Sequence, residues 1–157
     1  MRGNETVIKQ LNLALSSELT AIVQYMVQAE MCDNWGYKRL AGFHKQRAID
    51  EMHHAEHLIE RILFLDALPV VDVALKPQAG KDVKSQLEIN LKDELVAIKD
   101  YNAASKICRE AADNGTRELF EGLLKDEERH TDQLEAHLHS IGEIGIANYL
   151  TEQLKEK

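Results

Sequence analysis

The sequence repeats itself at an offset of 76 residues, and this duplication limits the chain to a small set of folds. The segment Glu-Leu-x-Ala-Ile-x-x-Tyr occupies residues 18–25 and returns at 94–101, and Asp-Glu-x-x-His-x-x-x-Leu occupies 50–58 and returns at 126–134. Both segments follow the spacing of an amphipathic helix. A repeat of this kind predicts two similar helical hairpins related by an approximate twofold axis.

Apolar residues recur at spacings of three and four over most of the chain, which is typical of bundle helices. We expect helices at about residues 4–33, 37–65, 83–112 and 116–141, and a short one at 146–155. The pattern lapses between about 66 and 82, where both prolines fall. A connection of that length can span a bundle, so the second and third helices can run parallel. The expected fold is all-α: an antiparallel four-helix bundle with one long crossover and a short C-terminal fifth helix, in one domain over residues 1–157.

Composition and charge exclude several classes of protein. Glycine and proline number only 8 and 2, which argues against a sandwich of many short strands. No apolar run approaches the ~18 residues that a membrane span requires. Polar residues interrupt the N-terminus where a secretory signal is apolar, so we expect a cytoplasmic protein. The net charge of −8 disfavours nucleic acid as a partner and favours cations.

Six polar residues fall inside the apolar stripes and are expected to converge at the middle of the bundle. They are Glu18, Glu51, His54, Glu94, Glu127 and His130. A single Glu-x-x-His is more often a surface pair, but its i,i+3 spacing places both side chains on one helix face, and here it occurs twice. Buried carboxylates without partners cost several kcal/mol each and repel one another. Two divalent cations would neutralise four of them, and this ligand set suits iron or manganese, with zinc as a competitor.

Two further repeated pairs accompany these residues. Tyr25 and Tyr101 lie two turns from Glu18 and Glu94 on the same stripes. Their hydroxyls would donate hydrogen bonds to the ligands, or the rings are core aromatics with a polar tip, and the sequence favours neither reading. Cys32 and Cys108 also correspond, and two cysteines are too few for a disulfide framework. We expect both to be inert thiols.

With these six residues in place, the chain resembles the ferritin-like di-iron carboxylate proteins and, more narrowly, the bacterioferritins. The resemblance covers essentially the whole chain. It implies iron storage and detoxification in a hollow shell of 24 chains, built from dimers, that oxidises Fe(II) with oxygen or peroxide and keeps the ferric mineral inside. It further implies that the six residues are ferroxidase ligands for two iron ions per chain, with Glu51 and Glu127 bridging.

The same resemblance implies a haem, of b type, shared between two chains, with Met52 of each as an axial ligand. Met52 belongs to a second apolar stripe with Ala48, Ala55 and Ile59, where a methionine by itself is more often interface filler. The residues expected to line the haem pocket are Leu19, Val23, Met26 and Ile49. A small ferredoxin would supply electrons to this haem for the release of iron.

The resemblance also makes Asp50 a candidate iron ligand on the inner surface of the shell. This chain has Gln46 where some family members have a histidine, and His44 is the residue that would compensate. Rival readings are a rubrerythrin-like peroxidase, a haem-bearing or structural bundle that binds zinc inertly, and a mini-ferritin. The first usually adds a Cys-x-x-Cys site that this sequence lacks, and the last places its ligands between subunits.

Overall fold

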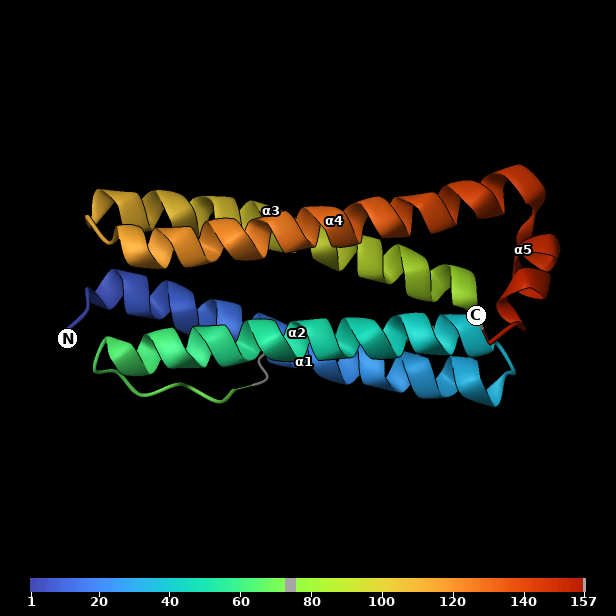
Figure 1. The fold of residues 1–157 in the computed structure, drawn as a ribbon, viewed down its shortest axis with the longest axis horizontal. Helices are drawn as coiled ribbons and strands as arrows, with labels where there is room; N and C mark the ends of the chain where they lie inside the picture. The colour runs from blue at the N-terminus through green and yellow to red at the C-terminus, as the bar shows by residue number, and fades with distance from the viewer. Residues whose placement is uncertain (73–75, 157) are drawn as a thin grey trace.

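The computed structural model describes residues 1–72 and 76–156 and is built from helices. The helices are α1 (Glu5–Asn34), α2 (Lys38–Phe64), α3 (Val83–Glu110), α4 (Asn114–Ile144) and α5 (Ile146–Gln153). The four long helices lie side by side, and α5 crosses one end of the bundle (Figure 1). The predicted all-α bundle with a short fifth helix is confirmed. Within the described residues, no helix is both long and apolar enough to cross a membrane.

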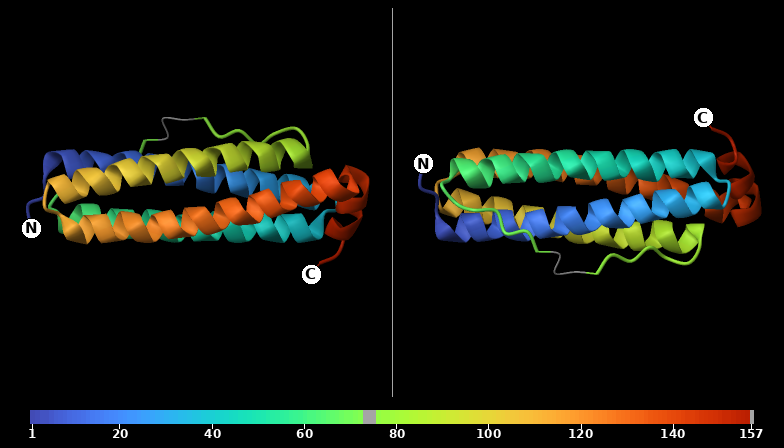
Figure 2. Two further views of the ribbon diagram at one scale, coloured as in Figure 1. Left: turned by 90° about the horizontal axis from the view of Figure 1, so that it is seen from above. Right: turned by 90° about the horizontal axis from the view of Figure 1, so that it is seen from below.

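The crossover between α2 and α3 runs back along α1, which sets the direction of α3. The Val70 N–H donates to Asn12 Oδ1 at 2.8 Å, and the Gln78 N–H donates to Gln24 Oε1 at 2.9 Å, three turns further along α1. α3 therefore begins at the end of the bundle where α2 begins, and these two helices run parallel (Figures 1 and 2). α1 and α4 are each antiparallel to both of them.

The helix ends follow from local capping groups. Asn4 begins α1, since its side chain accepts hydrogen bonds from the N–H groups of Thr6 and Val7. α4 continues to Ile144, three residues beyond its expected end at 141, because the chain stays helical through Gly142. The break comes at Gly145, whose φ of +79° is a conformation that glycine adopts without strain.

Two buried apolar clusters fill the bundle, one on each side of a polar middle. One is built from the start of α1 and α4 and the end of α2 and α3: Val7, Leu11, Ala14, Leu15, Ala55, Leu58, Ile62, Leu65, Tyr101, Ala104, Cys108, Phe120 and Leu123. The other lies toward α5: Cys32, Leu40, Val83, Leu87, Leu134, Ile141 and Tyr149. The apolar stripes thus pack on both sides of the residues singled out above.

A buried polar pair breaks the internal symmetry of the bundle in the half nearer α5. Gln28 Nε2 donates to Asn90 Oδ1 at 3.0 Å, and Asn90 Nδ2 donates back to Gln28 Oε1 at 2.8 Å. Both side chains are fully buried, and they join α1 to α3. The positions related to them by the repeat are Ala104 and Ala14, which are also buried. Mutual hydrogen bonds therefore fix the register of α1 and α3 in one half, and small apolar side chains occupy the other.

Replacing one partner of this pair should destabilise the chain, and replacing both should cost less than the two single losses added together. Gln28→Ala leaves Asn90 Nδ2 without its acceptor, and Asn90→Ala leaves Gln28 Oε1 without its donor, so each should cost about 1–3 kcal/mol. The double variant reproduces the alanine pair of the other half, and we expect its cost to be clearly below the sum of the two. Thermal unfolding of all three variants measures this coupling, and strictly additive losses would contradict it.

Candidate di-metal centre

The six polar residues predicted to converge do meet, in the polar middle between the two clusters. They come from all four long helices: Glu18 from α1, Glu51 and His54 from α2, Glu94 from α3, and Glu127 and His130 from α4. Each is buried, with at most 5% of its surface exposed. The i,i+3 spacing in α2 and α4 directs each glutamate and its histidine to the same side of the helix. The bundle thus encloses four carboxylates and two imidazoles.

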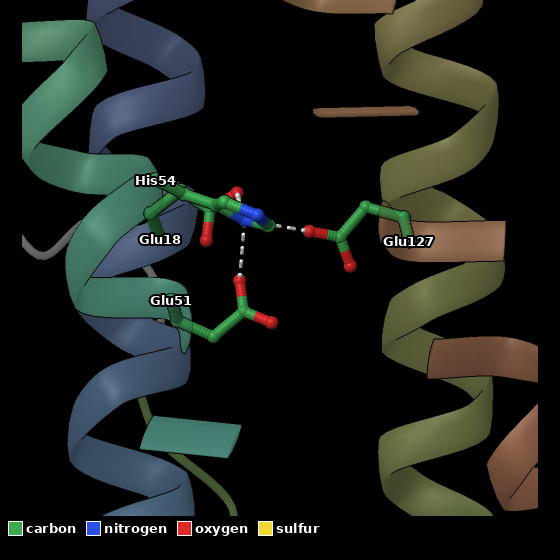
Figure 3. A group of neighbouring side chains, drawn as sticks. All are labelled: Glu18, Glu51, His54 and Glu127. Carbon is green, nitrogen blue, oxygen red and sulfur yellow. Dashed lines mark hydrogen bonds and ion pairs between the residues drawn. The ribbon is translucent and has the colours of Figure 1, made fainter. Parts of the chain in front are cut away.

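These side chains form two overlapping groups of four. One group contains Glu18 and His54, the other contains Glu94 and His130, and both contain Glu51 and Glu127. Within each group the ligand atoms lie within 4.8 Å of one another, a size suited to one cation. Figure 3 shows the first group, with Glu127 reaching His54 from the opposite side of the bundle. Because Glu51 and Glu127 are shared, they are the carboxylates able to bridge two cations.

Both histidines turn the same ring nitrogen toward the carboxylates. His54 Nδ1 lies 3.2 Å from Glu51 Oε2 and 3.1 Å from Glu127 Oε1, and His130 Nδ1 lies 3.0 Å from Glu51 Oε1. Each Nε2 faces an aspartate of the other repeat: Asp126 at 2.9 Å from His54, and Asp50 at 3.7 Å from His130. A carboxylate on the outer nitrogen orients an imidazole that binds metal through the inner one. Nδ1 is therefore the ligand atom that each histidine offers.

The two repeated tyrosines hold the two glutamates that are not shared. Tyr25 Oη donates to Glu94 Oε1 at 2.8 Å, and Tyr101 Oη donates to Glu18 Oε1. Each bond runs between α1 and α3, so each hairpin positions a glutamate of the other. Burial, together with the facing glutamate, raises the pKa of both phenols well above its usual value, so they remain donors at neutral pH. Of the two readings that the sequence left open, the tyrosines therefore follow the one in which their hydroxyls donate hydrogen bonds to the central glutamates.

The electrostatics of this centre favour the protonated form of several of its groups. Burial, reinforced by the neighbouring carboxylates, raises the pKa of Glu18 and Glu94 well above its usual value. Burial alone would also raise the pKa of Glu51, but hydrogen bonds with Glu18 and the histidines hold it well below that value. Burial opposes protonation of His130, yet its carboxylate partners raise its pKa to about 10. Cations must displace these protons, so metal binding should strengthen as the pH rises.

Arg47 is a member of the site that the sequence analysis did not single out. Its side chain is 2% exposed, with Nη1 3.5 Å from Glu94 Oε1 and Nη2 donating to Gln133 Oε1 at 2.6 Å. The position related to it by the repeat is Leu123, in the apolar cluster. The sequence did contain a signal for its burial, because Arg47 is a polar residue inside the apolar stripe of the second helix. The positive charge of Arg47 lies next to Glu94, so the two ligand groups differ in their electrostatic surroundings.

Two pockets reach the centre from opposite sides of the bundle. One, of about 390 Å³, lies between α1 and α3, where the crossover contributes Lys76 and Gln78, and it reaches all four glutamates. The other, of about 570 Å³, lies between α2 and α4 and reaches His54 and Asp126. Small reactants thus have an approach to the ligands from either side.

The predicted haem residues do not all lie on one exposed face. Met52 is 44% exposed, and Val23, Met26 and Ile49 are also exposed, on the neighbouring helices α1 and α2. Leu19 is partly buried and packs against the apolar core. The expected stripe through Ala48, Met52, Ala55 and Ile59 is narrower than predicted, because Ala55 is buried in that core and Ile59 packs against it.

The residues expected at the inner-surface iron site, Asp50 and His44, do not come together with Gln46 as a set of metal ligands. Asp50 is partly exposed, and Gln46 Nε2 donates to its Oδ1 at 3.0 Å. His44 cannot compensate for Gln46, because it is fully buried beside the rings of Tyr25 and Phe43. Burial lowers the pKa of His44 to about 3, so its imidazole stays neutral.

The two cysteines lie in different apolar clusters and are free thiols. Burial raises the pKa of Cys32 to about 12 and that of Cys108 to about 11. The thiolate is the reactive form of cysteine, so both groups are unreactive at neutral pH, in line with their expected inert role.

Comparison with known proteins agrees with this fold. Residues 8–144 match the family model of the ferritin-like domain, so the bundle and its buried carboxylates define a ferritin-like protein. The chain is 40% identical to a bacterioferritin of Brucella melitensis biotype 1 over 149 residues, which cover 95% of this chain and 92% of the relative. It is 39% identical to a bacterioferritin of Mycolicibacterium paratuberculosis (95% and 94% covered) and 38% identical to one of Rhodobacter capsulatus (92% and 90% covered). The chain therefore belongs to the bacterioferritin family.

The charge of Arg47 should make the cation position at Glu94 and His130 weaker than the one at Glu18 and His54. Removing this charge with Arg47→Met should reduce the ratio of the two stepwise Fe(II) binding constants at least about tenfold, which corresponds to ~1.4 kcal/mol. Anaerobic calorimetric titration measures both constants. Leu123→Met, at the position related by the repeat, is the matched control and should leave their ratio unchanged. Equal constants in the unaltered chain would contradict this asymmetry.

Proposed function

We propose that the chain stores and detoxifies iron by oxidising Fe(II) at the six-residue centre and keeping the ferric product as mineral inside a shell of 24 chains in the cytoplasm. The observation that carries the proposal is the pair of overlapping ligand groups that share Glu51 and Glu127. Two cations held by shared carboxylates lie close enough to give electrons to one small oxidant. Membership of the bacterioferritin family supports the same function.

The proposed reaction balances charge with the groups in the centre. Two Fe(II) ions carry four positive charges, which the four buried glutamates neutralise once their protons have left. Each ion gives up one electron, and dioxygen accepts two electrons and two protons to become hydrogen peroxide. Where peroxide is the oxidant, it accepts two electrons and two protons to give two molecules of water. The fixed carboxylates stabilise the rising charge on iron, so positioning and electrostatics supply the catalysis.

A rubrerythrin-like peroxidase is the alternative within the same fold class, and it is not favoured. The two cysteines of the chain are 76 residues apart in sequence and lie in separate clusters. They therefore offer no Cys-x-x-Cys iron site. An inert zinc bundle would not require a pocket on each side of the ligands.

Fe(II) added without oxygen should saturate at two ions per chain. Admitting oxygen should then give a fast phase of oxidation, which Glu18→Ala should abolish, because one ligand group loses a carboxylate that no neighbour replaces. Anaerobic titration followed by stopped-flow absorbance measures both results. Glu30→Ala, an exposed glutamate of the same helix, is the control and should keep the fast phase. Saturation at one ion per chain, or a fast phase that survives Glu18→Ala, would exclude the dinuclear mechanism.

The proposal extends to a haem between two chains, held by Met52 from each. Its support is an exposed thioether near other exposed apolar side chains, Val23, Met26 and Ile49, since apolar surface of this kind is usually covered by a partner. Two thioether ligands would favour the reduced haem. When bound, the haem supplies electrons for the release of stored iron, with a small ferredoxin as the proposed donor.

The purified assembly should contain one haem for every two chains, and Met52→Leu should remove it. Leucine keeps the apolar volume of methionine but has no sulfur to bind iron. The haem absorption band relative to protein concentration is the measurement. Met31→Leu, a methionine on α1 outside the proposed pocket, should retain the band. Haem binding that persists in Met52→Leu would show that another group holds it.

A further inference from the structure

The pocket between α2 and α4 carries chemistry that the six-residue centre does not use. It measures about 570 Å³ and lies on the opposite side of the bundle from the pocket between α1 and α3. Its wall includes His54 and Asp126, which are joined through His54 Nε2 at 2.9 Å. The pocket therefore ends at the outer edge of the centre.

Two more histidines, His53 and His57, line the same pocket. They are four residues apart on α2, so their side chains lie on one face of the helix, one turn apart. Histidines at this spacing can bind a single divalent cation together, as they do in helical zinc sites. Neither residue belongs to the two ligand groups of the centre.

Each histidine faces a glutamate one turn further along α2, and the contact of His53 is a hydrogen bond. His53 Nδ1 lies 3.2 Å from Glu56 Oε1, and His57 Nδ1 lies 3.6 Å from Glu60 Oε2. A carboxylate facing Nδ1 favours the tautomer in which Nε2 carries the lone pair, which is the form that binds metal. The two Nε2 atoms are thus the ligand atoms that the pair offers.

The charge of the pocket favours a cation. Three carboxylates line it, those of Asp50, Glu118 and Asp126. Arg129 is the cationic side chain among the lining residues, and its Nη2 lies 3.3 Å from Asp126 Oδ1, so its charge is partly neutralised. Imidazole and carboxylate ligands without thiolate suit Fe(II) and Zn(II) alike.

We propose that His53 and His57 form a further divalent-cation site in this pocket, separate from the six-residue centre. The site holds a cation beside His54, on the α2–α4 side of the bundle. Its role rests on the proposed function: a cation bound there raises the local supply of Fe(II) to the centre. The binding site itself does not depend on that function and is tested separately.

The test of the site is a count of bound Zn(II) on the assembled protein at pH 7, by calorimetry and equilibrium dialysis. The unaltered chain should bind three ions, and the double variant His53→Ala/His57→Ala should bind two. Each single variant should lose the same ion, since one imidazole cannot replace the pair. His139→Ala, which removes an exposed histidine of α4, is the matched control and should still bind three. A double variant that binds as many ions as the unaltered chain would overturn the proposal.

Two further measurements separate this site from the centre. Glu18→Ala/Glu127→Ala removes a ligand from both groups of the centre and should leave the ion at His53 and His57 bound. If the unaltered chain binds a single ion, and only the double histidine variant loses it, the new site is supported and the dinuclear centre is refuted. The Fe(II) concentration giving half-maximal oxidation should rise at least about threefold in the double histidine variant relative to His139→Ala, because the local supply of cation falls. An unchanged value would overturn the supply role.

Discussion

The burial of four carboxylates at one level of a helical bundle is the constraint on which the rest of the structure depends. Such groups are tolerated away from water only if protons, hydrogen bonds or cations offset their charge. In this chain, burial favours the protonated forms of Glu18 and Glu94, and hydrogen bonds hold the same groups, while the two ligand groups are of a size suited to cations. Glu18 and Glu94 each accept a hydrogen bond from a buried tyrosine, and two imidazoles lie between the carboxylates. The apolar clusters pack on either side of these groups along the bundle, and each group has at most 5% of its surface exposed.

The sequence repeat accounts for the symmetry of the centre, and departures from the repeat account for its asymmetry. His44 and Arg47 lie in the half nearer α5. The positions related to them by the repeat lie in the other half and hold Phe120 and Leu123. At these two positions one half of the bundle has apolar side chains, whereas the other has a buried imidazole and a buried guanidinium, the latter next to Glu94. Two cations bound at the centre would experience different electrostatic surroundings.

The architecture and the six central residues could be predicted because both depend on short-range spacing. Polar residues inside an apolar stripe point to the middle of a bundle whatever the neighbouring helix contains. The pairing of Asp126 with His54 could not be predicted, because it depends on the register of α2 against α4. The burial of His44 and Ala55 was missed for a related reason, since the width of each buried face depends on how closely the helices approach. Arg47 was visible as an exception in its stripe, but its partner Glu94 was not.

The exchanged tyrosine bonds make each hairpin depend on the other. Tyr25 of the first hairpin holds Glu94 of the second, and Tyr101 of the second holds Glu18 of the first. The aspartates behind the histidines are exchanged in the same way. Two separate, identical hairpins could make every one of these contacts without a covalent connection. The crossover between α2 and α3 contributes no residue to these contacts, so the symmetry of the centre does not depend on it.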